Sequence, residues 1–150
     1  MSALPIALAS DHAGVALKAL LVAELGHLGY EALDLGPMTG DSVDYPDYAA
    51  KLALAIKDNK AEKGVLICGS GIGISIAANR FPFIRAALCH SEETARLSRE
   101  HNDANVLVLG ARIVDEATAK AALAAFLTTE FAGGRHAGRV EKLGGLVRSS

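Results

Sequence analysis

A cysteine followed by three alternating glycines is the clearest chemical signal in this sequence. Gly69, Gly71 and Gly73 allow backbone N–H groups to converge at the start of a helix, where they favour an anion or an oxyanion. The spacing G-x-G-x-G departs from the dinucleotide fingerprint, and the lysine of a phosphate-binding P-loop is missing. A thiol beside such an electropositive turn is stabilised as the thiolate. With Ser70 next to it, Cys68 is interpreted as a reactive thiol rather than a small residue that closes a strand.

Two other polar groups could supply acids, bases or hydrogen bonds. Asp11 and His12 follow a short apolar run, and residues 101–103 read His-Asn-Asp. Asp11 also occupies the position of an N-cap for the next helix, and His12 that of an exposed loop residue. Residues 101–103 end a predicted helix, where polar side chains commonly face solvent. Each group therefore allows a structural and a catalytic interpretation.

The C-terminal segment 131–150 differs from the rest because it carries four basic residues against one acidic residue. Arg135 and Arg139 are four positions apart on one helical face, where they could bind a dianion together or be solvated. A thin apolar stripe follows the same spacing, at Val140, Leu143 and Val147. The pattern predicts a C-terminal helix, although Gly144 and Gly145 weaken it. It either packs on a neighbouring subunit or docks loosely as a chain end.

Composition excludes several classes of protein. A chain of 150 residues with 51% hydrophobic residues suits a single domain spanning 1–150. A formal charge of −2 argues against nucleic-acid binding, and no apolar run is long enough for a membrane span or a secretory signal. The two cysteines predict a reduced, cytoplasmic protein rather than a disulfide framework.

The elements that must position these residues alternate between strands and helices. Short β-type runs occupy residues 5–9, 31–35, 64–68, 85–89 and 105–109, with helical patterns between them. This alternation predicts a three-layer, Rossmann-like α/β sandwich with a five-stranded parallel sheet. Ligands of such sheets bind beyond the carboxyl ends of the strands. The residues that follow the predicted strands are therefore site candidates.

Several of these segments resemble ribose-5-phosphate isomerase type B, within the bacterial sugar-phosphate isomerase family. The resemblance covers nearly the whole chain, in the same order. The matching segments are SDHAG at 10–14, DYP at 44–46, ICGSGIGISIAAN at 67–79, LSREHNDANVL at 97–107, GAR at 110–112, GGRH at 133–136 and RV at 139–140.

The resemblance implies an aldose–ketose isomerase that converts ribose 5-phosphate to ribulose 5-phosphate through a cis-enediolate, a reaction of the pentose phosphate pathway. It implies no metal and no organic cofactor, and a homodimer or homotetramer with active sites between subunits. Cys68 would be the base, as in the branch that uses cysteine, since Ser75 replaces the acid of the other branch. Ser70 stands where relatives often carry threonine, and it keeps the hydroxyl.

The same resemblance assigns roles to the remaining candidates. Enediolate donors would be Ser70 and the backbone of Gly69, Gly71, Ile72, Gly73 and Ile74. Ring opening would use His101, with Asp11, Asp44 and Tyr45 nearby, and Asn102 would hydrogen-bond the sugar. The phosphate would be held by His12, Arg112, Arg135 and Arg139.

Two alternatives remain. The substrate could be allose 6-phosphate or another hexose 6-phosphate, because nothing in the sequence measures pocket depth. A non-catalytic, flavodoxin-like nucleotide-binding module is the alternative from another class. It would need a phosphate loop rich in Ser, Thr and Gly after the first strand, where this chain has Asp11 and His12.

Overall fold

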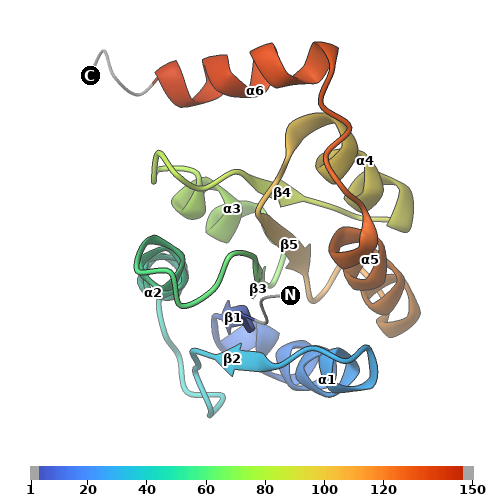
Figure 1. Cartoon of the computed structure of the whole chain (residues 1–150). Coiled ribbons are helices and arrows are strands. Elements are labelled where there is room, and N and C mark those ends of the chain that lie inside the picture. Colours follow the sequence, from blue (N-terminus) through green and yellow to red (C-terminus); the bar gives the residue numbers. More distant parts are fainter. Residues whose placement is uncertain (1–3, 147–150) are drawn as a thin grey trace.

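The computed structural model describes residues 4–146 as one parallel sheet between two layers of helices (Figure 1). This confirms the predicted class, and the strand bounds differ from the prediction by no more than one residue at either end. The strands are β1 Ile6–Ser10, β2 Ala32–Asp34, β3 Gly64–Cys68, β4 Ala86–Leu88 and β5 Val106–Gly110. The helices are η1 His12–Gly14, α1 Val15–His27, α2 Tyr45–Lys57, α3 Ile72–Ala78, α4 Glu92–Asn102, α5 Glu116–Thr128 and α6 Arg135–Gly145.

The strand order is β2-β1-β3-β5-β4, and each recorded pairing is parallel. A flavodoxin-like sheet has the order 2-1-3-4-5, so this sheet differs from it by placing β5 between β3 and β4. The order reverses between β1 and β3. Ligands of open α/β sheets bind beside such a reversal, at the carboxyl ends of the strands.

Both faces of the sheet are buried, which explains the continuous apolar runs in β3 and β5. Side chains alternate between the faces: Ile67 packs in the core with residues of α1, α4 and α5, whereas Cys68 packs in the core with residues of α2 and α3. The Cys68 thiol therefore lies on the face of the sheet that α2 and α3 cover.

Local capping sets where the helices begin. The Asp11 side chain accepts a hydrogen bond from the Ala13 N–H at 2.9 Å, which caps η1 as predicted. Ser91 and Thr94 form a capping box at the start of α4. Because α4 connects β4 to β5, it begins near the carboxyl ends of the strands and ends near their amino ends.

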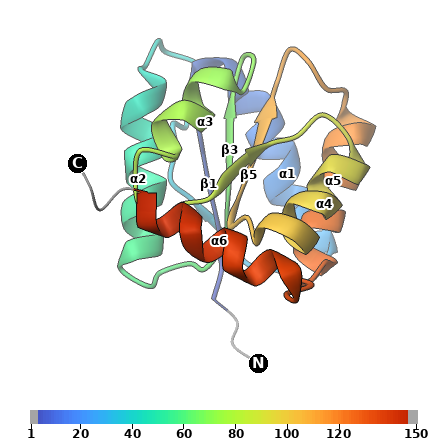
Figure 2. The ribbon, with the colours of Figure 1, turned by 90° about the horizontal axis from the view of Figure 1, so that it is seen from above.

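Helix α6 lies outside the three layers. It lies beyond the β4 edge of the sheet (Figure 1), on the side of the amino ends of the strands (Figure 2). No side chain between Arg135 and Gly145 is buried. The predicted helix is therefore present, with both glycines inside it, while Val147 lies outside the described residues. Within residues 4–146, none of the helices has the length and apolar character needed to cross a membrane.

Candidate functional site

The structure gathers the first group of predicted residues at the carboxyl ends of β1 and β3, where the strand order reverses. We call this group the first cluster. Asp11 follows β1, and its N–H donates to the Ile67 carbonyl at 3.0 Å, so Asp11 lies beside the end of β3. The cluster comprises Asp11, His12, Asp44, Tyr45, Cys68, Gly69, Ser70, Gly71, Ile72, Gly73, Ile74 and Arg112.

The glycine turn places a backbone donor on the cysteine sulfur. The Gly71 N–H donates to Cys68 Sγ at 3.2 Å, and the Ile72 N–H donates to Ser70 Oγ at 3.1 Å. Gly71 has φ +80°, and a Cβ there would lie 2.5 Å from Leu88 Cδ1, so only glycine fits. Sγ thus accepts a hydrogen bond, a contact that is stronger for a thiolate than for a thiol.

The other two glycines make room for polar side chains. A Cβ on Gly69 would lie 2.9 Å from Arg112 Nη1, so the guanidinium lies against the backbone directly after Cys68. A Cβ on Gly73 would lie 2.6 Å from Tyr45 Cζ, so the Tyr45 ring covers the first turn of α3. The alternating glycines therefore leave room for a cation against Gly69 and a phenol against Gly73, both on the turn that follows Cys68.

His12 ties the loop after β1 to the loop before α2. Its Nδ1 accepts a hydrogen bond from the Val43 N–H at 3.2 Å, and Val43 precedes Asp44, the N-cap residue of α2. The exposed ring of His12 is thus held beside Asp44 and Tyr45. Both the structural and the chemical interpretations of Asp11 and His12 are compatible with these contacts.

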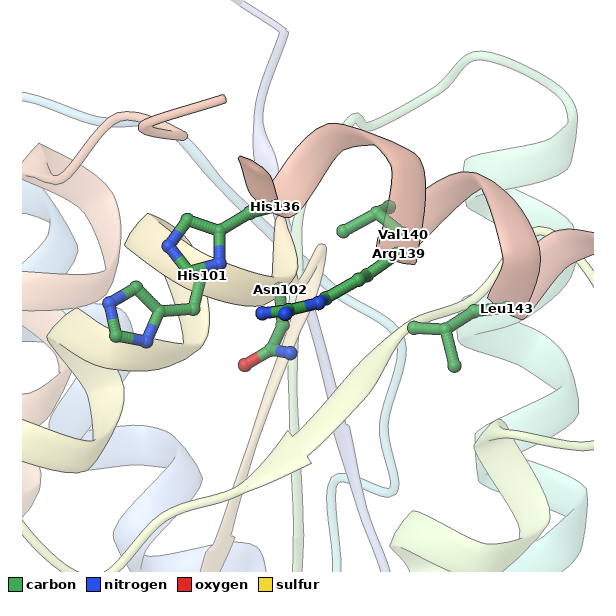
Figure 3. Close-up of a pocket in the computed structure, with 6 residues that line it drawn as sticks. All are labelled: His101, Asn102, His136, Arg139, Val140 and Leu143. Atoms are coloured by element: carbon green, nitrogen blue, oxygen red, sulfur yellow. The ribbon is translucent and has the colours of Figure 1, made fainter. Parts of the chain in front are cut away.

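The remaining predicted residues form a second cluster between the end of α4 and α6. A cavity of about 310 Å³ is lined by His101 and Asn102 of α4 and by Arg139 of α6 (Figure 3). In Figure 3 the Arg139 guanidinium and the Asn102 amide point toward the same space. Arg135 lies at the start of the same helix, one residue before His136.

His136 also belongs to the second cluster, although its position in the sequence predicted no role for it. Its ring stacks on that of His101, with 4.3 Å between centroids and 16° between planes. Burial against its neighbours, then the charges of His101, Arg135 and Arg139, lower the pKa of His136 from 6.5, so it is neutral at pH 7. Its helical spacing from Arg139 and Val140 is the sequence signal that could have identified it.

The two clusters lie at opposite ends of the sheet. Cys68 pairs in register with Gly110 at the end of β5, whereas His101 and Asn102 lie just before Val106, where β5 begins. At about 3.3 Å per residue, β5 alone separates its two ends by about 13 Å. One chain therefore does not bring Cys68 and His101 to the same point.

Metal ligands do not converge in the described part of the chain. Among residues 4–146, no three His, Cys, Asp or Glu side chains form a group that could hold a metal ion. The chemistry available at the two clusters is that of a thiol, histidines, carboxylates, guanidinium groups and backbone N–H groups.

Known proteins match this chain over nearly its whole length. The sequence model of the family described as Ribose/Galactose Isomerase matches residues 6–143. The chain is 46% identical over 138 residues to Ribose-5-phosphate isomerase B of Escherichia coli, covering 92% of this chain and 93% of that protein. It is 43% identical over 142 residues to D-erythrulose-4-phosphate isomerase of Pectobacterium atrosepticum, covering 94% and 93%.

A solved structure from the same family has the same fold as this chain. The ribose-5-phosphate isomerase B of Clostridium thermocellum superposes with a TM-score of 0.94 at 48% identity, covering 97% of this chain and 98% of that one. These matches confirm the resemblance inferred from the motifs, together with the predicted fold.

Proposed function

The chain belongs to the Ribose/Galactose Isomerase family, and from this membership we propose that it interconverts ribose 5-phosphate and ribulose 5-phosphate with Cys68 as the base. The observation that carries the proposal is the Gly71 N–H on Cys68 Sγ, at the carboxyl end of β3. A base at this position is surrounded by the donors that an enediolate requires.

The proton transfer would run between C2 and C1 of the open-chain sugar. The Cys68 thiolate takes the proton from C2, the C–H electron pair forms the C1–C2 double bond, and the C1=O π pair moves onto O1 to give the enediolate. The proton of O2 then passes to O1, the thiol returns its proton to C1, and C2–O becomes the carbonyl of the ketose. Ser70 and the N–H groups in the first turn of α3 would donate to the enediolate oxygens. The Ile72 N–H already donates to Ser70 Oγ, whereas the N–H groups of Gly73 and Ile74 have no acceptor one turn earlier in the helix and are available to a ligand.

The second cluster would supply the remaining functions, from a second copy of the chain. His101 would open the furanose ring, Asn102 would hydrogen-bond the sugar, and Arg135 and Arg139 would bind the phosphate with His12 and Arg112. The separation of about 13 Å along β5 supports a site built from two chains, since one chain cannot join its own clusters.

The surface around α6 also supports assembly with a second copy. Leu143 is 47% exposed, and a groove of about 690 Å³ separates α6 from the segment 79–87. Phe81, Pro82 and Ile84 line this groove together with Val140 and Leu143. A helix with an apolar stripe and no buried side chain gains stability when another chain covers it. We therefore propose a homodimer, alone or paired into a tetramer, with sites at the subunit interface.

A thiol base works only while it is reduced. Both cysteines are free and buried. This requirement suits the reducing cytoplasm, where we place the reaction.

The substrate is tested by direct comparison of sugars. Purified protein is given ribose 5-phosphate and allose 6-phosphate in parallel, and ketose formation is followed over time. The proposal expects a higher kcat/KM for ribose 5-phosphate. A higher value for allose 6-phosphate would instead identify a hexose-phosphate isomerase, and no ketose from either sugar would reject both.

His101→Ala is expected to lower kcat/KM for ribose 5-phosphate by about 10²- to 10⁴-fold, because general acid–base help at the ring oxygen is lost. The comparison substrate is D-erythrose 4-phosphate, which cannot close a furanose ring because its O4 carries the phosphate. Its kcat/KM should change little. Equal losses for both sugars would mean that His101 serves proton transfer or the fold.

Arg139→Ala is expected to raise KM with little change in kcat, because the phosphate does not change during the reaction and its binding is uniform. Loss of a charge-assisted contact costs about 1.5–3 kcal/mol, or roughly 10- to 150-fold in kcat/KM. Inhibition by inorganic phosphate should weaken in parallel. Lys142→Ala on the same helix, outside the cavity lining, is the control. Unchanged KM and phosphate inhibition would exclude Arg139 as a phosphate ligand.

A further inference from the structure

Arg99 is a buried arginine that has no part in the proposed proton transfer, ring opening or phosphate binding. It lies in α4, two residues before His101, and is 7% exposed. Its Nη1 donates to Asp103 Oδ1 at 2.8 Å and to the Ala104 carbonyl at 2.7 Å, and its Nε donates to the Thr129 carbonyl at 3.1 Å. One planar guanidinium thus joins the end of α4 to the end of α5.

The acceptors of Arg99 flank the second cluster on both sides. Asp103 and Ala104 directly follow Asn102, and Asp103 ends α4 with φ +47°. Thr129 begins the linker that leads to α6, and the Ala132 N–H of that linker donates to the Glu100 carbonyl at 3.0 Å. The two parts of the second cluster, the end of α4 and the start of α6, are therefore attached to each other around Arg99.

We propose that Arg99 is a positioning residue that holds His101 and Asn102 in register with Arg135 and Arg139, a role that rests on the proposed function of the second cluster. A buried ion pair adds little stability compared with apolar residues of similar volume, because removing two charges from water is costly. What the guanidinium provides is geometry, since its rigid fork reaches three acceptors on two segments.

The test is Arg99→Lys, which keeps the charge and loses the fork. An ammonium group can reach Asp103 or Ala104 but cannot also hold Thr129 in the same plane. We expect kcat/KM for ribose 5-phosphate to fall at least about 10-fold, because a misplacement of about 1 Å can cost up to 10²-fold. KM should rise as for Arg139→Ala, and D-erythrose 4-phosphate should lose less kcat than ribose 5-phosphate, as for His101→Ala.

Two further variants separate positioning from general stability. Arg96→Lys is the matched control, because Arg96 lies in the same helix and also pairs at i, i+4, with Glu100 at 3.1 Å, but its side chain is 43% exposed. It should leave the kinetics unchanged. In Asp103→Asn, the amide oxygen can still accept the hydrogen bond from Arg99 Nη1, and asparagine tolerates the positive φ at this position. The variant should therefore keep near-native activity.

Mixed assemblies provide the decisive readout. If Arg99 serves only the second cluster, Arg99→Lys chains mixed with Cys68→Ser chains regain activity. In such a mixed dimer, one site combines Cys68 of the Arg99→Lys chain with the intact second cluster of the Cys68→Ser chain. Arg99→Lys chains mixed with Arg139→Ala chains gain no activity over the two separate proteins when ribose 5-phosphate is well below the KM of either variant. A folded Arg99→Lys protein with kcat/KM within twofold of the wild type overturns the proposal, and so does recovery with Arg139→Ala but not with Cys68→Ser.

The mixture of Cys68→Ser chains with Arg139→Ala chains is assayed first. If activity does not return in this mixture, the two-chain site of the proposed function is wrong, and the result says nothing about Arg99. In that case the two sugars decide the role of Arg99. A smaller loss of kcat for D-erythrose 4-phosphate than for ribose 5-phosphate in Arg99→Lys supports the positioning role, and equal losses overturn it. If Arg99→Lys does not fold, Asp103→Gly replaces it, because glycine tolerates the positive φ and removes the Oδ1 that holds Nη1, and a folded Asp103→Gly protein with kcat/KM within twofold of the wild type then overturns the proposal.

Discussion

Replacing Cys68 by serine is expected to lower kcat by at least about 100-fold, since general base catalysis typically contributes 10²- to 10⁴-fold and a serine hydroxyl is far too weak a base at neutral pH. The fold should survive because serine is close in size and the site lies at a strand end. Inhibition by inorganic phosphate should also survive, because the substitution leaves all four proposed phosphate ligands, His12, Arg112, Arg135 and Arg139, unchanged. The measurements are kcat, the phosphate inhibition constant and the melting temperature.

Cys89→Ser is the matched control for this experiment. Cys89 is also buried, but it lies in the core on the opposite face of the sheet, and burial raises the pKa of its thiol. Its replacement should leave kcat within a small factor of the wild type, whatever it does to stability. If Cys68→Ser instead retains more than a tenth of the wild-type kcat, Cys68 is not the base.

Mixing Cys68→Ser chains with Arg139→Ala chains is expected to restore about a quarter of the wild-type activity, assayed at ribose 5-phosphate well below the KM of the Arg139→Ala protein, where each separate variant is nearly inactive. In a random mixture of dimers, half contain one chain of each kind. If the two clusters of a site come from different chains, such a dimer has one intact site and one that lacks both residues. Half of the dimers with half of their sites intact gives the expected fraction.

The chains are co-refolded or co-expressed with different tags, and the mixed dimers are purified before the assay, where half of the wild-type activity is then expected. Cys68→Ser mixed with His101→Ala should recover in the same way, because His101 also belongs to the second cluster. Confirmed mixed dimers without activity would place Cys68 and Arg139 of one site on the same chain, against the separation seen along β5.

Much of this architecture could be predicted because its signals are local. Residues 65–67 and 106–109 are apolar without alternation, which is typical of strands covered on both faces, and both runs lie in buried strands. Asp11, Pro46 and Ser91 mark helix starts, because a cap depends on one side chain and the nearest backbone groups. Most of the first cluster was also accessible from sequence, since it follows strands at the carboxyl edge of a parallel sheet.

The sequence by itself thus determined the class of the fold, the glycine turn around Cys68 and the family. Only the tertiary structure decided that β5 inserts between β3 and β4, that α4 carries His101 to the opposite end of the sheet, and that α6 remains unburied beside it. It also decided the stacking of His136 on His101 and the contacts of Arg99 with Thr129. The physical reason is that these features join residues 20 or more positions apart, and such pairings depend on how whole layers pack rather than on local spacing.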